Sequence, residues 1–125
     1  MQISKKTSER QYTVAPLPDS DPELTFTVRI LTDPEIAKIY DKHGYLPGGS
    51  KATMAKLLTV SKEMMKASIV GWTNFNDENG TLLDLSDKNK MLLYETEVEI
   101  DSEVTTLWQL VQAKVSEQRR AEAKN

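Results

Sequence analysis

The clearest pattern in the sequence is a strict alternation of apolar and polar residues after position 23. The apolar members are Leu24, Phe26, Val28 and Ile30. A period of two, rich in β-branched and aromatic residues, predicts a β-strand. Tyr12 and Val14 alternate in the same way before a proline-rich break over residues 16–22. We therefore expect an N-terminal β-hairpin, which needs helices against its apolar face because a two-stranded ribbon is marginally stable alone.

A helical pattern follows this hairpin directly. Thr32 and Glu35 have the spacing of a capping box, and Pro34 lies in the first turn, where its missing N–H is harmless. The helix is expected to end near His43-Gly44, because glycine readily takes the left-handed conformation of a helix cap. Residues 45–49 hold three helix breakers and predict a linker.

A second and longer helix is predicted over residues 51–70, with Ser50 as its cap. Its apolar stripe, at spacings of three and four, comprises Met54, Leu57, Leu58, Ser61, Met64 and Met65. Gly71-Trp72 interrupts this pattern. Asn79-Gly80 then predicts a turn, and Ser86 is placed to cap a short helix that carries Met91, Leu92 and Tyr94.

Residues 95–103 carry an acid at every second position and allow two interpretations. As a strand, they would present an acidic face opposite Val98 and Ile100. As a loop before a helix, they would place Asp101 and Glu103 at a helix N-terminus, where negative charge is favourable. We favour the loop because a helical stripe follows, formed by Ile100, Val104, Leu107, Trp108, Val111 and Val115. This closing helix is expected to end at about Arg119.

Together these elements predict an α+β fold that is mostly α, with an N-terminal β-hairpin followed by about four helices packed as one small domain. The length of 125 residues fits a single domain. We expect residues 1–10 to form a flexible arm, residues 11–118 the globular domain, and residues 119–125 a charged tail that frays.

Composition removes several classes of chemistry from consideration. The chain has no cysteine and a single histidine, His43, which excludes disulfides, thiol nucleophiles and paired-histidine metal sites within one chain. No apolar run approaches the ~20 residues of a membrane span, and residues 1–10 lack the apolar segment of a signal peptide. We therefore expect a cytosolic protein that is not an enzyme and needs no metal or cofactor.

Candidate binding residues are apolar and few. Met64 and Met65 suit an adaptable binding surface, although core packing is the simpler interpretation. Trp72 and Trp108 are candidates for core anchors first and interface hot spots second. The acidic run over residues 95–103 is either a solvated face or a patch that faces a partner. Basic residues gather near both chain ends, but the net charge of −3 argues against nucleic-acid binding.

The order of motifs along the chain resembles that of the tail assembly chaperones of long-tailed, siphovirus-type bacteriophages and prophages. The motifs are Leu31-Thr32-Asp33-Pro34-Glu35 at a helix start, Val70-Gly71-Trp72 after a long helix, the acidic turn Asp77-Glu78-Asn79-Gly80, Leu82 to Leu85, and Ser86 with Asn89. The resemblance covers residues 11–115. It implies a non-enzymatic protein of the host bacterial cytoplasm. Such a protein keeps the tape measure protein soluble and helps the tail tube protein to polymerise around it.

Binding of a helix in an apolar groove is the mechanism that this function suggests. We expect the long helix, through Met64 and Met65, and the closing helix to flank such a groove. Six residues are candidates for partner binding, namely Met64, Met65, Trp72, Leu107, Leu110 and Val111. Self-association is a further expectation, because apolar helix faces are in surplus. The competing interpretation is a small regulatory or nucleic-acid-associated protein of a mobile element, with the basic ends as contacts.

Overall fold

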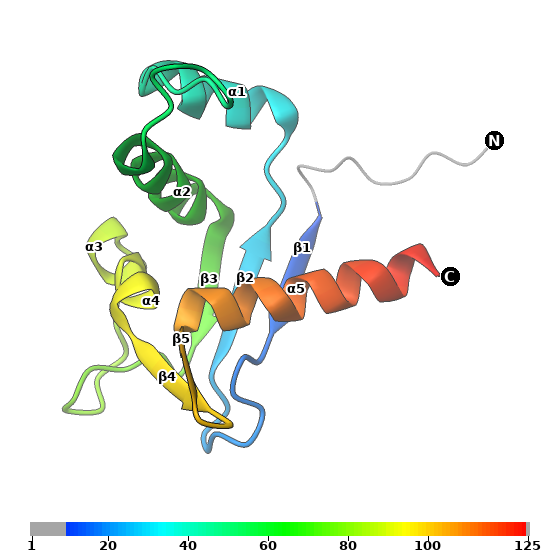
Figure 1. The fold of residues 1–125 in the computed structure, drawn as a ribbon. Coiled ribbons are helices and arrows are strands. Elements are labelled where there is room, and N and C mark those ends of the chain that lie inside the picture. The colour runs from blue at the N-terminus through cyan, green and yellow to red at the C-terminus, as the bar shows by residue number, and fades with distance from the viewer. Residues whose placement is uncertain (1–9, 125) are drawn as a thin grey trace.

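The computed structural model describes residues 10–124 and shows a small α+β fold, as expected (Figure 1). The arm predicted for residues 1–10 lies outside the described residues except for Arg10. In chain order the elements are β1 (Gln11–Val14), β2 (Thr25–Arg29), α1 (Asp33–Lys42), α2 (Met54–Ser68), β3 (Ile69–Thr73), α3 (Asp87–Lys90), α4 (Leu92–Glu95), β4 (Glu97–Ile100), β5 (Glu103–Thr106) and α5 (Leu107–Ala123).

The main sheet is antiparallel and has β2 at its centre, in the order β1–β2–β3. Its two faces differ as the alternating pattern predicts. Tyr12, Val14, Phe26 and Val28 point to the buried face. On the other face, the threonine hydroxyls of Thr13 and Thr27 lie 2.9 Å apart, and those of Thr25 and Thr73 lie 2.6 Å apart. The predicted hairpin is confirmed, and it is one part of a three-stranded sheet.

The third strand replaces the end of the predicted long helix. α2 begins at Met54, capped by the Thr53 hydroxyl rather than by Ser50, and it ends at Ser68 rather than at residue 70. β3 starts at the next residue, and its Trp72 pairs with Phe26 across the sheet. The β-branched Ile69 and Val70 favour a strand, and pairing with β2 satisfies backbone groups that a frayed helix end would leave open.

α1 forms as its sequence predicts. The Thr32 hydroxyl accepts a hydrogen bond from the Glu35 N–H, and the Glu35 carboxylate accepts one from the Thr32 N–H at 3.0 Å. At the other end, His43 is the cap residue and Gly44 takes a φ of 59°. The sequence alone predicts both ends of α1, because each capping hydrogen bond joins residues only a few positions apart.

The interpretation of the acidic run as a loop and a helix start is wrong. Residues 97–106 form a second antiparallel hairpin, β4–β5, in which Ile100 pairs with Glu103. Asp101 and Ser102 make its two-residue turn, with φ values of 51° and 69°. Such left-handed pairs are typical of tight hairpin turns, but this one lacks the glycine that normally signals them. The alternation of acids with Val98 and Ile100 was therefore the correct signal for a strand.

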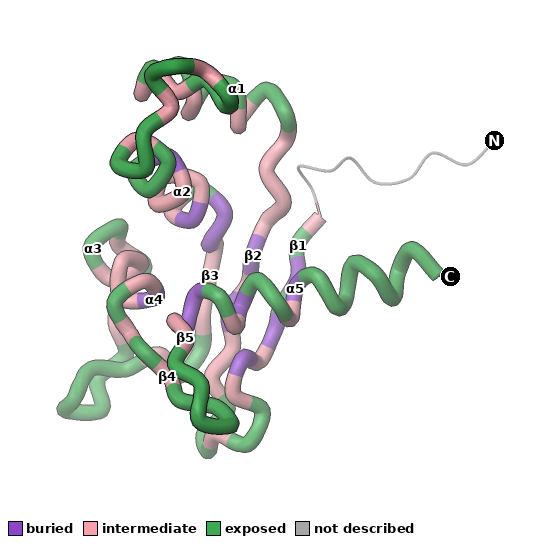
Figure 2. Tube along the Cα trace, in the orientation of Figure 1, coloured by how far each residue is buried: buried purple, intermediate pink, exposed green. Residues whose placement is uncertain are grey.

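α5 covers the buried face of the main sheet and closes the core (Figures 1 and 2). It starts at Leu107 behind a capping box formed by Thr106 and Gln109. The buried part of the predicted stripe is confirmed at Leu107, Trp108, Val111 and Val115. The helix continues to Ala123, four residues beyond the predicted end at Arg119, and most of the expected charged tail is thus helical.

The strained turn of β4–β5 yields a test of this assignment. An L-residue in the left-handed region costs about 1–2 kcal/mol, more than the roughly 0.5–1 kcal/mol of chain entropy that glycine loses on folding. We expect Ser102→Gly to raise the free energy of unfolding by about 0.5–1 kcal/mol in urea titrations. The control Ser102→Ala keeps the strain and should show no gain. Equal stability of all three proteins would contradict the left-handed turn.

Candidate partner-binding groove

A groove of about 630 Å³ lies between α2 and α5, over the end of β2 and the start of α1. Its lining from the two helices comprises Ser61, Met64, Met65, Ser68, Trp108, Val111, Gln112, Val115, Ser116 and Arg119. Ile30, Leu31 and Ile36 extend the apolar wall on the side of α1. The lining is therefore mixed, because apolar side chains alternate with short polar groups along both helices and the charged residues Arg29, Asp33 and Arg119 lie at its border.

Three of the six predicted binding residues meet in this groove. Met64 is half-buried and accessible at the wall. Met65 and Val111 line the groove from beneath, since both are fully buried in the core. A partner can touch Met64 directly, whereas Met65 and Val111 support the surface that it would meet.

The other three predicted residues lie elsewhere. Leu107 is a core residue and Leu110 is half-buried, and neither lines the groove. Trp72 stands on β3, where its indole N–H donates to the Leu83 carbonyl at 3.0 Å. It packs edge-on against Phe26 and Phe75, with ring centroids 6.1 and 5.1 Å away. Trp72 thus belongs to an aromatic cluster with Phe26 and Phe75 and does not line the groove.

The first half of α2 exposes apolar side chains that the sequence pattern assigned to a buried stripe. Met54 is 68% exposed, Leu57 37% and Leu58 47%. Helical periodicity places these residues on the same face as Ser61 and Met64, which line the groove. We call this face, from Met54 through Leu57, Leu58 and Ser61 to Met64, the apolar track. Periodicity alone could not show that the side chains of Met54, Leu57 and Leu58 are exposed.

The wall on the side of α1 is held by an ion pair at the start of that helix. The Arg29 guanidinium donates to both oxygens of Glu35, at 2.9 and 2.7 Å. These bonds, followed by the bond from the Thr32 N–H, lower the pKa of Glu35 from 4.5 to about 2. The same carboxylate raises the pKa of Arg29. The pair fixes the entry of the chain from β2 into α1, and with it the position of Leu31 and Ile36.

The other end of α1 is tied to α2 through Glu63. Its carboxylate lies 2.8 Å from the Lys42 ammonium and 3.0 Å from Nε2 of His43. Both contacts, that of Lys42 first, lower the pKa of Glu63. The single histidine thus has a structural position at the C-terminal end of α1, where it contacts Glu63 of α2.

Comparison with protein-family models, curated proteins and solved structures found no match to this chain. Over residues 10–124, no helix is both long enough and apolar enough to cross a membrane. Within the same range, no three side chains of His, Cys, Asp or Glu gather as a metal site would require.

The Arg29–Glu35 pair predicts a pH dependence of stability. Because folding lowers the pKa of Glu35, the contribution of the ionised carboxylate to the free energy of unfolding is complete above about pH 4.5 and is lost as the pH falls toward 2. We expect Glu35→Gln to lower the free energy of unfolding at pH 7 by about 0.5–1 kcal/mol, since glutamine keeps the cap but loses the ion pair. Urea titrations between pH 7 and 2 should show the difference from the parent protein disappearing through this window. A difference that is constant with pH would contradict the assignment.

Proposed function

We propose that the protein is a non-enzymatic tail assembly chaperone of a long-tailed bacteriophage or prophage, acting in the host bacterial cytoplasm. In this proposal it binds amphipathic helices of the tape measure protein and helps the tail tube protein to assemble around that protein. The observation that carries it is the apolar track, exposed on α2 and continuous with the α2–α5 groove. The order of sequence motifs supports the same function independently.

The dimensions of the surface suit a helix as the ligand. α2 rises about 1.5 Å per residue, so the face from Met54 to Ser68 extends over about 20 Å. A partner helix of some four turns can place apolar anchors at spacings of three and four residues against such a face. Methionine at both ends of the track supplies unbranched, polarisable side chains that adapt to different partner sequences.

The groove is also suited to a partner that must later leave. Ser61, Gln112 and Ser116 lie among its apolar residues. A bound apolar helix would cover these polar groups without offering each of them a hydrogen bond, which reduces the net free energy of binding. Such a surface favours weak, reversible binding of many similar helices over tight binding of one helix, as a chaperone requires.

Charged substitutions on the apolar track test this proposal. We expect Leu58→Glu and Met64→Glu each to weaken binding of a tape measure helix by about tenfold or more, because a carboxylate buried against an apolar partner loses its hydration. Binding can be measured by fluorescence anisotropy with labelled peptides that tile the tape measure protein. The solubility of the co-expressed full-length partner gives a second measurement.

Leu82→Glu is the matched control, since Leu82 is 58% exposed but lies in the loop before α3, outside the groove. This variant should bind as the parent protein does, and circular dichroism should show that all three variants are folded. If the track variants bind and solubilise the tape measure protein as well as the control does, the groove is not its binding site.

A further inference from the structure

We propose that copies of this chain associate head to tail. The acidic β4–β5 hairpin, which precedes α5 in one copy, docks in an arginine-lined cavity at the C-terminal end of α5 in the next copy. This inference goes beyond the proposed function and does not depend on it. The hairpin lies outside the α2–α5 groove, and of the three cavity arginines only Arg119 also borders that groove.

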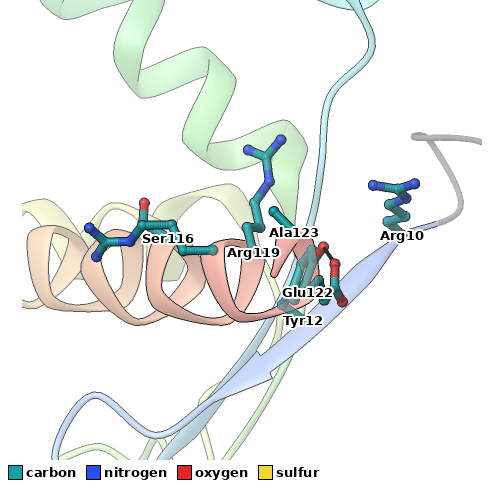
Figure 3. A pocket seen from close by; sticks show the side chains of 7 residues that line it. Arg10, Tyr12, Ser116, Arg119, Glu122 and Ala123 are labelled. Atoms are coloured by element: carbon teal, nitrogen blue, oxygen red, sulfur yellow. Dashed lines mark hydrogen bonds between the residues drawn. The ribbon is translucent and has the colours of Figure 1, made fainter. Parts of the chain in front are cut away.

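The cavity has a volume of about 760 Å³ and joins the start of β1 to the last turns of α5 (Figure 3). Arg10, Arg119 and Arg120 line it, above a hydrogen bond of 2.6 Å from the Tyr12 hydroxyl to the Glu122 carboxylate. Glu122 raises the pKa of Tyr12, while the charges of Arg10 and Arg119 lower it, which is consistent with both guanidinium groups lying close to this bond. Arg10, near one end of the described chain, thus borders the same cavity as Arg119 and Arg120, near the other.

Within the residues that the structure describes, this cavity is lined by more positive than negative side chains. Over residues 10–124, the carboxylates found in ion pairs are Glu35, Glu63, Asp87 and Glu117, and their partners do not include these three arginines. Glu122, the carboxylate in the cavity wall, accepts the Tyr12 hydroxyl. Three arginines and one carboxylate therefore border a space that is large enough to admit side chains from another molecule.

The β4–β5 hairpin carries the opposite charge. Glu97, Glu99, Asp101 and Glu103 of the hairpin are all exposed, as is Glu95 at the end of α4 just before it. The sequence has no lysine or arginine between Lys90 and Lys114. Ile100 and Val104 are 40% and 64% exposed on the same ribbon. The hairpin thus offers carboxylates that complement the arginines, together with apolar side chains that a second copy can cover.

These two surfaces cannot meet within one copy. The hairpin joins the first residue of α5, whereas Arg119 and Arg120 lie twelve and thirteen residues further along that helix, about 18–20 Å away. This distance exceeds the screening length of ~8 Å at physiological ionic strength. Each copy therefore presents one acidic and one basic surface at opposite ends of a rigid helix, an arrangement that generates heterologous rings or open filaments. A nucleic acid fits the cavity charge less well, because the nearby acids and the net charge of −3 would repel it.

Charge reversal gives a complementary test in the full-length protein. We prepare a cavity variant, Arg10→Glu with Arg120→Glu, and a hairpin variant, Glu97→Lys with Glu99→Lys and Glu103→Lys. Neither variant changes a groove residue. Sedimentation velocity at low salt should show concentration-dependent assembly of the parent protein. Each variant alone should assemble about tenfold more weakly or worse, because its two surfaces now carry like charge. An equimolar mixture should recover assembly, since every hairpin then finds a cavity of opposite sign.

Exposed charges elsewhere provide matched controls: Lys38→Glu with Lys88→Glu, and Glu23→Lys with Glu78→Lys. Both should assemble as the parent protein does, and raising the salt to 0.5 M should weaken every assembly. Three results would overturn the proposal. One is a parent protein that stays monomeric at low salt up to millimolar concentration. Another is a mixture that assembles no better than its components. The third is binding of DNA or RNA through Arg10 and Arg120 by a protein that remains monomeric.

Discussion

The burial of Phe26 on the central strand is the constraint from which the rest of the structure follows. Its ring is fully buried, with Val14 and Trp72 as its cross-strand neighbours and with edge-on contacts to Trp72 and Phe75. To place Trp72 there, β3 must pair with β2 directly after α2. The last turns of α2, with Met65 and Ser68, are therefore buried in the core, while its first turns extend beyond the sheet. The exposed apolar track is thus a consequence of how the core is closed.

Sequence reasoning succeeded where the decisive interactions are local. The capping box of Thr32 and Glu35, the alternation over residues 24–30 and the stripe of Leu107, Val111 and Val115 are each set by neighbours within a few positions. It failed at β3 and at β4–β5, where pairing across the chain or an uncommon turn decides the outcome. Ile69 and Val70 fit the end of a helix and the start of a strand equally well until β2 is known to lie beside them.

The candidate site shows the same division. Periodicity correctly placed Met64 and Met65 on one face of a long helix, but only the position of α5 decides which of the two a partner can reach. One residue along a helix is a rotation of about 100°, enough to separate a groove wall from the core. Leu110 was predicted to bind a partner, yet it lies outside the groove lining. An apolar pattern identifies a face, whereas packing determines how much of that face is free.

α5 connects the two proposals physically. Its middle, through Val111 and Val115, forms one wall of the groove, while its ends carry the acidic hairpin and the arginine-lined cavity. Contacts made at the two ends leave the middle free, so a head-to-tail array would present one groove per copy at a regular spacing. A long helical partner offers many similar segments, and linked weak sites then bind with an avidity that no single groove provides. The same array would release its partner once the contacts between copies open. Tight binding of the partner by the array is therefore compatible with weak, reversible binding by each single groove.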